Sequence, residues 1–262
     1  MPHLNISVVI PLYNEADNLT ELQNELRAAL AGIEHEIIFV DDCSTDATVD
    51  TIEGRSEVRL LRLERRSGQS AAMYFGIYAA TKDIIVLLDG DRQNDPADIR
   101  HLLTEIEGGA DLVCGYRLRR QDTLIKRLTS RIANWVRSRF VNDRVRDSGC
   151  TLKAMRRECR DALVPFNGMH RFIPALIKGA GFKVVEIPVN HRPRTAGKSK
   201  YSLQNRAISA SVDMLGVRWL VSRRFALGLT TVLNDTSTVS RRVGKSRSQN
   251  KNPPTSEHDG QP

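Results

Sequence analysis

Two pairs of acidic side chains each close a short apolar, β-branched segment of the chain. Asp41 and Asp42 close the second such segment, and Asp89 and Asp91 close the fourth. In an open parallel sheet the carboxyl ends of the strands meet at one edge, and ligands bind there. Each pair also has a structural explanation, a polar loop with a helix cap for the first and an Asp-Gly turn for the second. Two such clusters at one edge favour a binding site.

The Asp89-Gly90-Asp91 sequence suits a metal-bound diphosphate. A nucleotide diphosphate is strongly anionic and gains negative charge as it departs, so carboxylates alone would repel it. A hard divalent cation, Mg²⁺ or Mn²⁺, accepts carboxylate and diphosphate oxygens together and stabilises the leaving group. Gln93, two residues on, can add a neutral oxygen ligand. This segment therefore predicts metal-assisted departure of a nucleotide diphosphate.

The first half of the chain alternates between strand and helix patterns, which predicts an α/β fold with a mostly parallel sheet. Strands are predicted at residues 6–10, 36–40, 58–63, 84–88 and 112–115. Helices are predicted at 17–31, 46–52, 70–80 and from residue 96 onward. Asp46 and Asp95 are the expected N-caps of the second and fourth of these helices, and Pro96 the first residue of the fourth.

The second half is less regular. Residues 124–140 predict a basic amphipathic helix, 151–155 an antiparallel strand, 183–189 another, and 201–219 a helix. Beyond residue 230, Ser, Thr, Asn, Lys, Arg and Pro dominate, and such a tail holds too little apolar material to pack. We therefore expect a disordered basic tail.

The composition is that of a soluble globular protein with a basic balance. Of 262 residues, 40% are apolar and 27% charged, and 39 Lys and Arg against 31 Asp and Glu give a net charge of +8. This excess predicts an anionic partner. The four scattered cysteines form no CxxC pair, which predicts reduced thiols in the cytosol. We find no signal peptide and no uncharged apolar run of about 18 residues, so we expect a chain that is soluble or held at a membrane face.

Four motifs in the first 100 residues resemble those of family 2 glycosyltransferases, which have the GT-A fold. They are the segments 8–15 (VVIPLYNE), 40–46 (VDDCSTD), 66–72 (RSGQSAA) and 88–96 (LDGDRQNDP). The resemblance implies a Rossmann-like sheet flanked by helices. We expect a transferase domain at 1–200, an amphipathic helical segment at 201–229 and a tail at 230–262, which lies outside the resemblance. The resemblance also implies transfer of a sugar from a nucleotide diphosphate.

The same resemblance assigns site residues. Donor contacts are implied for Pro11, Tyr13, Glu15, Asp42, Gln69 and Asp89. The metal is implied to lie on Asp91 and Gln93 together with Asp89, and Asp89 and Asp91 are the implied catalytic centre. Arg92 stands where related sequences carry an apolar residue, and it either points to solvent or adds a diphosphate contact.

The second half resembles a narrower group, the polyprenyl-phosphate sugar transferases, which includes dolichol-phosphate mannose synthases. The matching segments are 115–117 (GYR), 147–150 (DSGC) and 191–201 (HRPR through GKSKY). Because Arg binds phosphate oxygens in a bidentate way, Arg117 and Arg131 are candidates for the lipid phosphate. A Gly-containing loop that can close over the diphosphate carries further candidate phosphate contacts, although a solvated basic surface is the alternative for any single Arg. They are Arg192, Arg194, Lys198 and Lys200. Asp147 is a catalytic candidate for orienting sugar or acceptor.

A phosphate acceptor is already ionised, so one in-line displacement with inversion is expected without a general base. The helix predicted at 124–140 carries Trp135 among apolar and basic residues, as interfacial helices do, although a core-facing stripe explains it equally well. Residues 203–220 can form a second interfacial helix. Together these features predict a peripheral protein at the cytoplasmic face of the membrane.

Three alternatives remain open. The acceptor can be a saccharide or a protein, or the chain can bind nucleotide sugars without catalysis, although the complete Asp89, Asp91 and Gln93 set argues against loss of activity. Nucleic-acid binding is suggested only by charge and lacks an aromatic platform, with aromatics at 5%. The Asp-Gly-Asp-x-Gln-Asn-Asp-Pro form favours a UDP-sugar over GDP-mannose.

Overall fold

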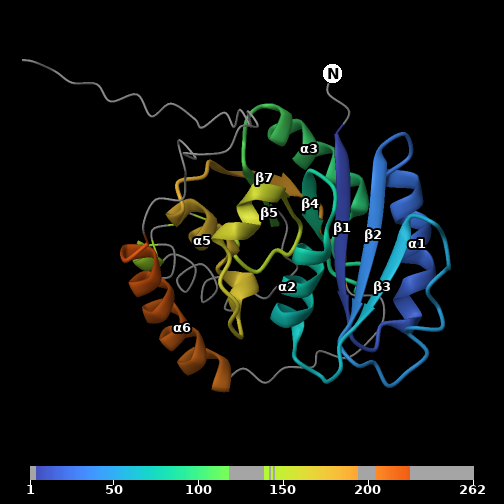
Figure 1. Ribbon diagram of the computed structural model, residues 1–262, viewed down its shortest axis with the longest axis horizontal. Helices are drawn as coiled ribbons and strands as arrows, with labels where there is room; N and C mark the ends of the chain where they lie inside the picture. Colours follow the sequence, from blue (N-terminus) through green and yellow to red (C-terminus); the bar gives the residue numbers. More distant parts are fainter. Residues whose placement is uncertain (1–3, 118–138, 142, 144, 194–203, 225–262) are drawn as a thin grey trace, which may run out of the picture. The chain divides into compact units, whose positions relative to one another are not determined.

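The computed structural model describes residues 4–117, 139–141, 143, 145–193 and 204–224 (Figure 1), which fall within one compact unit, Met1–Phe225. The strands are β1 (Asn5–Leu12), β2 (Glu34–Asp41), β3 (Val58–Arg62), β4 (Ile84–Leu87), β5 (Leu112–Arg117), β6 (Lys153–Arg156) and β7 (Val184–Val189). The α-helices are α1 (Ala16–Ala29), α2 (Gln69–Ala79), α3 (Ile99–Glu107), α5 (Ile173–Gly179) and α6 (Gln204–Ser222). Short 3₁₀ helices are η1 (Pro96–Asp98), η2 (Arg157–Ala162) and η3 (Met169–Arg171).

The strands form a seven-stranded mixed sheet in the order β3-β2-β1-β4-β6-β5-β7 (Figure 1). β1 pairs in parallel with both β2 and β4, and β2 pairs in parallel with β3. β6 runs antiparallel between β4 and β5, whereas β7 is parallel to β5. The predicted α/β fold class, with its mostly parallel sheet between helices, is confirmed.

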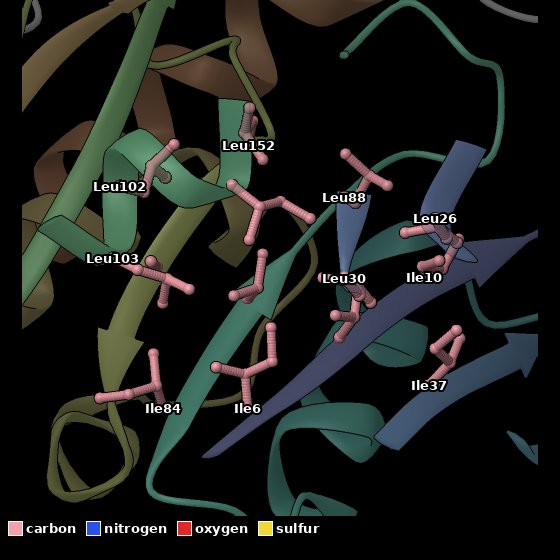
Figure 2. Packing of buried hydrophobic residues seen from close by; sticks show 14 of the residues in the cluster. Ile6, Ile10, Leu26, Leu30, Ile37, Ile84, Leu88, Leu102, Leu103 and Leu152 are labelled. Carbon is pink, nitrogen blue, oxygen red and sulfur yellow. The ribbon is translucent and has the colours of Figure 1, made fainter. Parts of the chain in front are cut away.

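Helices cover both faces of the sheet, which is why β1 is apolar on both sides. Ile6 and Ile10 of β1 face α1 and α3 and pack in one cluster with Leu26 and Leu30 (Figure 2). Val9 faces the opposite way and packs with residues of α2 and α5. The leucines at positions 19, 22, 26 and 30 are fully buried, as the helical spacing predicts, and burial of each contributes about 1.5–3 kcal/mol.

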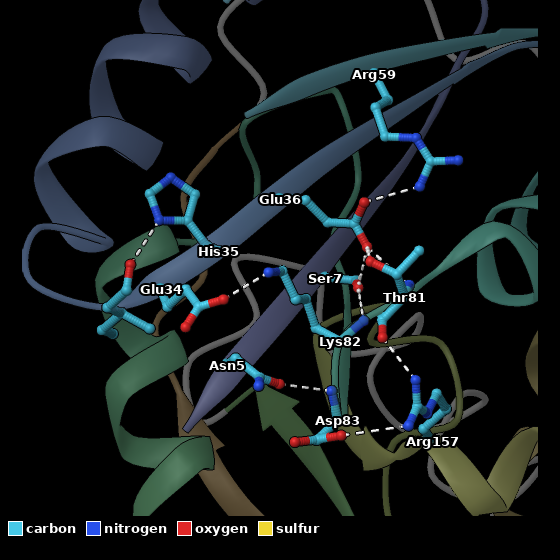
Figure 3. Close-up of polar contacts among 11 residues, drawn as sticks. Asn5, Ser7, Glu34, His35, Glu36, Arg59, Thr81, Lys82, Asp83 and Arg157 are labelled. Carbon is cyan, nitrogen blue, oxygen red and sulfur yellow. Dashed lines mark hydrogen bonds and ion pairs between the residues drawn. The ribbon is translucent and has the colours of Figure 1, made fainter. Parts of the chain in front are cut away.

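A buried carboxylate, Glu36, connects the amino ends of the first four strands (Figure 3). Glu36 of β2 accepts hydrogen bonds from Ser7 Oγ of β1 at 2.6 Å and from the Thr81 backbone N–H at 2.7 Å, and it pairs with Arg59 of β3 at 2.8 Å. Burial alone would raise the pKa of Glu36, but these hydrogen bonds lower it from 4.5 to about 2. The amino ends of the first strands are thus joined around one charge.

Two sequence expectations are wrong. Residues 46–52 form turns and not a helix. The Asp46 side chain accepts the Thr48 N–H, as an N-cap would. Farther along, however, the Gln23 side chain accepts from Glu53 N and donates to Thr51 O, so these backbone groups bond to Gln23. The strand expected at 183–189 is present, but it is parallel to β5 and not antiparallel. β6 lies between β4 and β5, so β7 pairs with the outer edge of β5. Its direction depends on the long connection through η2, η3 and α5, which a strand pattern in the sequence does not show.

The remaining elements agree with the sequence to within a few residues. The Asp95 side chain accepts the Ala97 N–H at 3.0 Å, and Pro96 opens η1 as expected. Of the basic helix expected at 124–140, all but the last two residues lie outside the described residues, as does the tail expected at 230–262. All four cysteines are free thiols. No helix in the described part of the chain has the length and hydropathy that a bilayer crossing requires.

Candidate active site

The carboxyl ends of β1, β2 and β4 lie side by side and bring the first, second and fourth motifs together. Asp42 N donates to Leu12 O at 2.9 Å, and Leu88 N donates to Val9 O at 3.1 Å. Gly90 lies so close to β1 that an added Cβ would be 2.7 Å from Leu12 Cδ2. Glycine, which has no side chain, avoids this contact in the middle of the Asp-Gly-Asp sequence.

Asp42 connects the second motif with the third. Its two carboxylate oxygens accept the backbone N–H groups of Ser67, at 2.6 Å, and Gly68, at 2.8 Å, immediately before α2. Gly68 has φ of +88°, a conformation that glycine adopts readily. The structure therefore shows Asp42 ordering the loop from which Gln69 extends. Asp41 is fully buried and accepts from Ser44 N, which makes it a loop-forming residue.

Gln69, the first residue of α2, reaches Asp89. Its Nε2 donates to Asp89 Oδ1 at 2.8 Å. Burial and then the charge of Asp91 raise the pKa of Asp89 to about 6, although a hydrogen bond from Thr151, the charge of Lys153 and the Gln69 contact act in the opposite direction. The contacts from Thr151, Lys153 and Gln69 therefore offset only part of the cost of burying the ionised Asp89 carboxylate beside Asp91.

The Asp89–Asp91 pair fits a divalent cation. Mutual repulsion of two carboxylates is what a cation between them relieves, and carboxylate and amide oxygens are the ligands that Mg²⁺ and Mn²⁺ accept. Asp91 Oδ1 also accepts the Gln93 backbone N–H at 3.2 Å, which folds the segment back on itself. Among the described residues no group of three His, Cys, Asp or Glu side chains gathers. A metal here needs oxygens from Gln93 and from a bound diphosphate.

The first motif contributes an aromatic surface and several loop contacts. The guanidinium of Arg66 lies over the Tyr13 ring, 3.9 Å from its centroid. Glu15 accepts from Asn18 Nδ2 at 2.7 Å, and its backbone N–H donates to Thr48 Oγ1. Pro11 and Tyr13 are half-buried at the end of β1. Their proposed contact with a nucleotide base remains a prediction.

On the acceptor side, two predicted residues bind each other. Arg117, at the end of β5, donates from Nε to Asp147 Oδ2 at 2.7 Å and from Nη2 to Asp147 Oδ1 at 2.9 Å. Both side chains are largely buried, at 14% and 9% exposure. Asp147 therefore occupies the Nε–Nη2 edge of the guanidinium, and a phosphate would bind Arg117 through Nη1 or by displacing Asp147. Arg131, Arg194, Lys198 and Lys200 lie outside the described residues.

Arg192 and Arg92 have protein partners. Arg192 pairs with Glu25 at 2.9 Å and with Asp95 at 2.8 Å. Arg92 also pairs with Glu25, at 2.7 Å, so of the two roles considered from the sequence the structure shows neither. Both guanidiniums brace the segment that follows β4.

A small cavity of about 150 Å³ lies beside Asp89, and sequence reasoning missed most of its lining. Lys153 is 2% exposed and donates from Nζ to the Cys150 carbonyl. His170 Nδ1 lies 2.7 Å from Ser70 Oγ. A lysine inside an otherwise apolar predicted strand was the available signal for the first of these residues. A lone histidine in an irregular segment gave no such signal for the second.

Comparison with known proteins agrees with this geometry. The sequence profile of glycosyl transferase family 2 matches residues 7–161. A dodecaprenyl-phosphate galacturonate synthase of Rhizobium johnstonii is 36% identical over 229 residues, covering 83% of this chain and 68% of that protein. An undecaprenyl-phosphate 4-deoxy-4-formamido-L-arabinose transferase of Enterobacter sp. is 37% identical over 217 residues, covering 80% and 66%. The chain spans about two thirds of the length of these relatives.

Among solved structures, glucosyl-3-phosphoglycerate synthase from Mycobacterium tuberculosis, in complex with Mn²⁺, UDP and phosphoglyceric acid, superposes with a TM-score of 0.63. The match covers 84% of this chain and 78% of that chain at 20% identity, so it bears on the fold alone. The chain belongs to glycosyl transferase family 2. The resemblance predicted from its motifs, to that family and to the polyprenyl-phosphate sugar transferases within it, is confirmed.

Proposed function

We propose that this glycosyltransferase moves a sugar from a nucleotide diphosphate to a polyprenyl phosphate, with inversion at the sugar carbon. The observation that carries the proposal is the strand edge where Asp89 and Asp91 adjoin the loop that Asp42 and Gln69 organise. The names of the two relatives, which specify dodecaprenyl and undecaprenyl phosphate, support the acceptor. The Asp-Gly-Asp-x-Gln-Asn-Asp-Pro form of the fourth motif favours a UDP-sugar, with GDP-mannose as the other candidate.

The donor occupies the edge formed by the four motifs. Asp91 and Gln93, with Asp89, hold Mg²⁺ or Mn²⁺, which when bound neutralises the charge that develops on the departing diphosphate. Gln69 keeps Asp89 oriented through its 2.8 Å hydrogen bond. The cavity beside Asp89 is of a size to take part of the transferred sugar and to exclude water from it.

The acceptor approaches from the side of Asp147. Ser148 and Gly149 line the cavity beside Asp89, so the Asp147 loop and its partner Arg117 border the reacting centre. An acceptor phosphate oxygen attacks the anomeric carbon, the bond to the diphosphate breaks, and its electron pair leaves with the diphosphate. Since the phosphate is already ionised, positioning replaces proton transfer. Arg131, Arg192, Arg194, Lys198 and Lys200 remain candidate phosphate contacts, although Arg192 must first leave its carboxylate partners.

One face of α6 fits a membrane surface. Val212, Leu215 and Trp219 are 62%, 61% and 64% exposed and recur at helical spacing, whereas Val217 on the other face is buried. Exposed apolar side chains on one face of a helix, with Trp among them, are typical of helices that lie in the interface. We propose that this stripe, Val212, Leu215 and Trp219, holds the enzyme at the cytoplasmic face where its lipid acceptor lies.

The test is a donor screen with purified protein, Mn²⁺ and a short polyprenyl phosphate. We expect radiolabelled sugar to enter the lipid fraction from one nucleotide sugar, and EDTA to abolish the transfer. Donor binding without transfer to any polyprenyl phosphate would contradict the acceptor assignment, and transfer to an added saccharide would replace it. If Asp91→Ala left the biological role intact, a non-catalytic nucleotide-sugar binding protein would be the better description.

A further inference from the structure

The segment that carries the metal-binding residues is held from two sides. On one side is α1, where Glu25 accepts from Arg92 Nη2 at Oε1, 2.7 Å away. The second carboxylate oxygen of Glu25, Oε2, accepts from Arg192 Nη1 at 2.9 Å. A single half-buried carboxylate therefore receives two guanidiniums, one from the segment after β4 and one from the segment after β7.

The second side is the chain that follows β7. Arg192 N donates to the Gln93 carbonyl at 2.9 Å, and its Nη2 pairs with Asp95 at 2.8 Å. Asn94 and His191 form an antiparallel bridge between these contacts. The Gln93 backbone is therefore hydrogen-bonded to Arg192, whose side chain is paired with Glu25.

Arg92 lies between two predicted metal ligands in a conformation that its side chain disfavours. Its φ is +61°, in the left-handed region, which costs a non-glycine residue about 1–2 kcal/mol. That conformation accompanies the turn in which Asp91 Oδ1 accepts Gln93 N. A strained residue persists only where its surroundings hold it, and the Glu25 ion pair is the contact that holds this one.

We propose that Glu25 is a positioning residue for the metal site, acting through Arg92 and Arg192 to fix Asp91 and Gln93. The inference rests on the proposed metal-dependent function. Removing the carboxylate would leave two guanidiniums converging on a neutral group, and their repulsion would release Arg92 from its turn and Arg192 from Gln93. Outer contacts of this kind tune metal affinity without touching the metal.

The experiment measures Mn²⁺ binding in the presence of UDP by electron paramagnetic resonance, so it is independent of the acceptor. We expect Glu25→Gln to weaken Mn²⁺ binding about tenfold, Glu25→Asp to recover part of the loss, and the donor KM to rise more than kcat falls. Glu21→Gln, one turn away on the exposed side of α1, is the matched control and should bind as wild type does. Thermal melting of all variants identifies any that lose structure.

A second variant separates the ion pair from the backbone. Arg92→Gly relieves the left-handed strain but removes the guanidinium, and we expect it to weaken Mn²⁺ binding as Glu25→Gln does. Wild-type Mn²⁺ affinity in both Glu25→Gln and Arg92→Gly would overturn the positioning role and leave the proposed function intact. If the wild-type protein bound no Mn²⁺ with UDP, the proposed metal-dependent function would fail and this inference with it.

Discussion

Three non-glycine residues have positive φ in the described part of the chain, and each follows a strand at the edge where the motifs meet. They are Asn14 at 53°, Cys43 at 59° and Arg92 at 61°. Side-chain contacts hold all three: Asn14 Oδ1 accepts from Thr45 N at 2.8 Å, Cys43 Sγ donates to Leu63 O at 3.0 Å, and Arg92 pairs with Glu25. Residues with strained backbone conformations are common at functional sites, where the surrounding structure holds them and offsets the cost of about 1–3 kcal/mol each. Asp89 lies at the same edge, where burial and the charge of Asp91 disfavour its ionised form.

Asp89→Asn should therefore stabilise the metal-free protein while abolishing transfer. Because the pKa of Asp89 is raised to about 6, the native state binds this proton more tightly than the unfolded state, and wild-type stability falls as pH rises from about 4 to about 6. In EDTA at pH 7.5 we expect the variant to be about 1–3 kcal/mol more stable in urea unfolding, and transfer to fall at least about 100-fold. Asp50→Asn, at an exposed carboxylate, is the control. Lower stability of Asp89→Asn would contradict this account.

At the scale of the elements, the position of α2 against the sheet decides whether the third motif meets the fourth. Gly76 of α2 lies directly over β1 and β2, where an added Cβ would be 2.3 Å from Val9 Cγ1 and 3.0 Å from Val40 Cγ2. Both neighbours are buried β-branched residues that cannot move aside. Close approach at Gly76 is what brings Gln69, at the start of the same helix, within reach of Asp89.

Gly76→Ala should thus destabilise the protein by about 1–3 kcal/mol and reduce transfer by displacing α2. Gly216→Ala is a matched change, since Gly216 lies within α6 with nothing within 4 Å of the added Cβ. There the improved helix propensity should stabilise by about 0.5–1 kcal/mol. Chemical denaturation measures both, and equal effects of the two substitutions would contradict the packing argument.

The Glu36 network predicts a pH dependence at the opposite edge of the sheet. Its depressed pKa contributes stability that is fully present above pH 4.5 and is lost as pH falls toward about 2. Glu36→Gln should cost about 2–3 kcal/mol at pH 7, and the difference from wild type should shrink over that acid window. Unfolding measured at several pH values checks this, with Glu64→Gln, at an exposed residue, as the control. A difference that stays constant with pH would show that shape and not charge is responsible.

At the scale of the whole molecule, the exposed large apolar side chains among the described residues lie on three elements. Leu60 lies on β3, the strand at one edge of the sheet, and Phe75 and Tyr78 lie on α2. The stripe of Val212, Leu215 and Trp219 lies on α6, which packs against α5 through its other face. Arg218 and Arg223 are exposed on the same helix. Apolar and basic residues together are what an anionic membrane surface attracts.

The double substitution Leu215→Gln and Trp219→Gln should therefore lower the affinity for anionic vesicles about tenfold or more, as measured by co-sedimentation. The reason is that about 1.5–3 kcal/mol is lost for each apolar side chain no longer buried in the membrane. Transfer to a water-soluble, short-chain polyprenyl phosphate should be retained. Leu60→Gln removes an exposed apolar residue elsewhere and should leave vesicle binding unchanged. Undiminished binding by the double variant would assign membrane attachment to another part of the chain.

The sequence alone determined the α/β class, most strand and helix positions in the first half, and the carboxylates of the Asp-Gly-Asp segment. These features are encoded locally, because hydrophobic periodicity and turn residues act over a few positions. The presence of the four motifs in the expected order along the chain was sufficient to identify the family. The helix predicted after Asp46 was wrong, because a capping residue cannot show that the distant Gln23 side chain bonds to the backbone of Thr51 and Glu53.

Tertiary structure decided which charged residues serve the site directly and which hold it in place. Arg192 meets Glu25 across 167 residues of sequence, and Arg117 meets Asp147 across 30, so neither partner can be read from neighbouring residues. A basic residue matches a lipid phosphate and a protein carboxylate equally well, and only the folded chain shows which carboxylate is within reach. The direction of β7 was also decided by the fold, because the connection through α5 returns the chain to the outer edge of β5 in the direction of that strand.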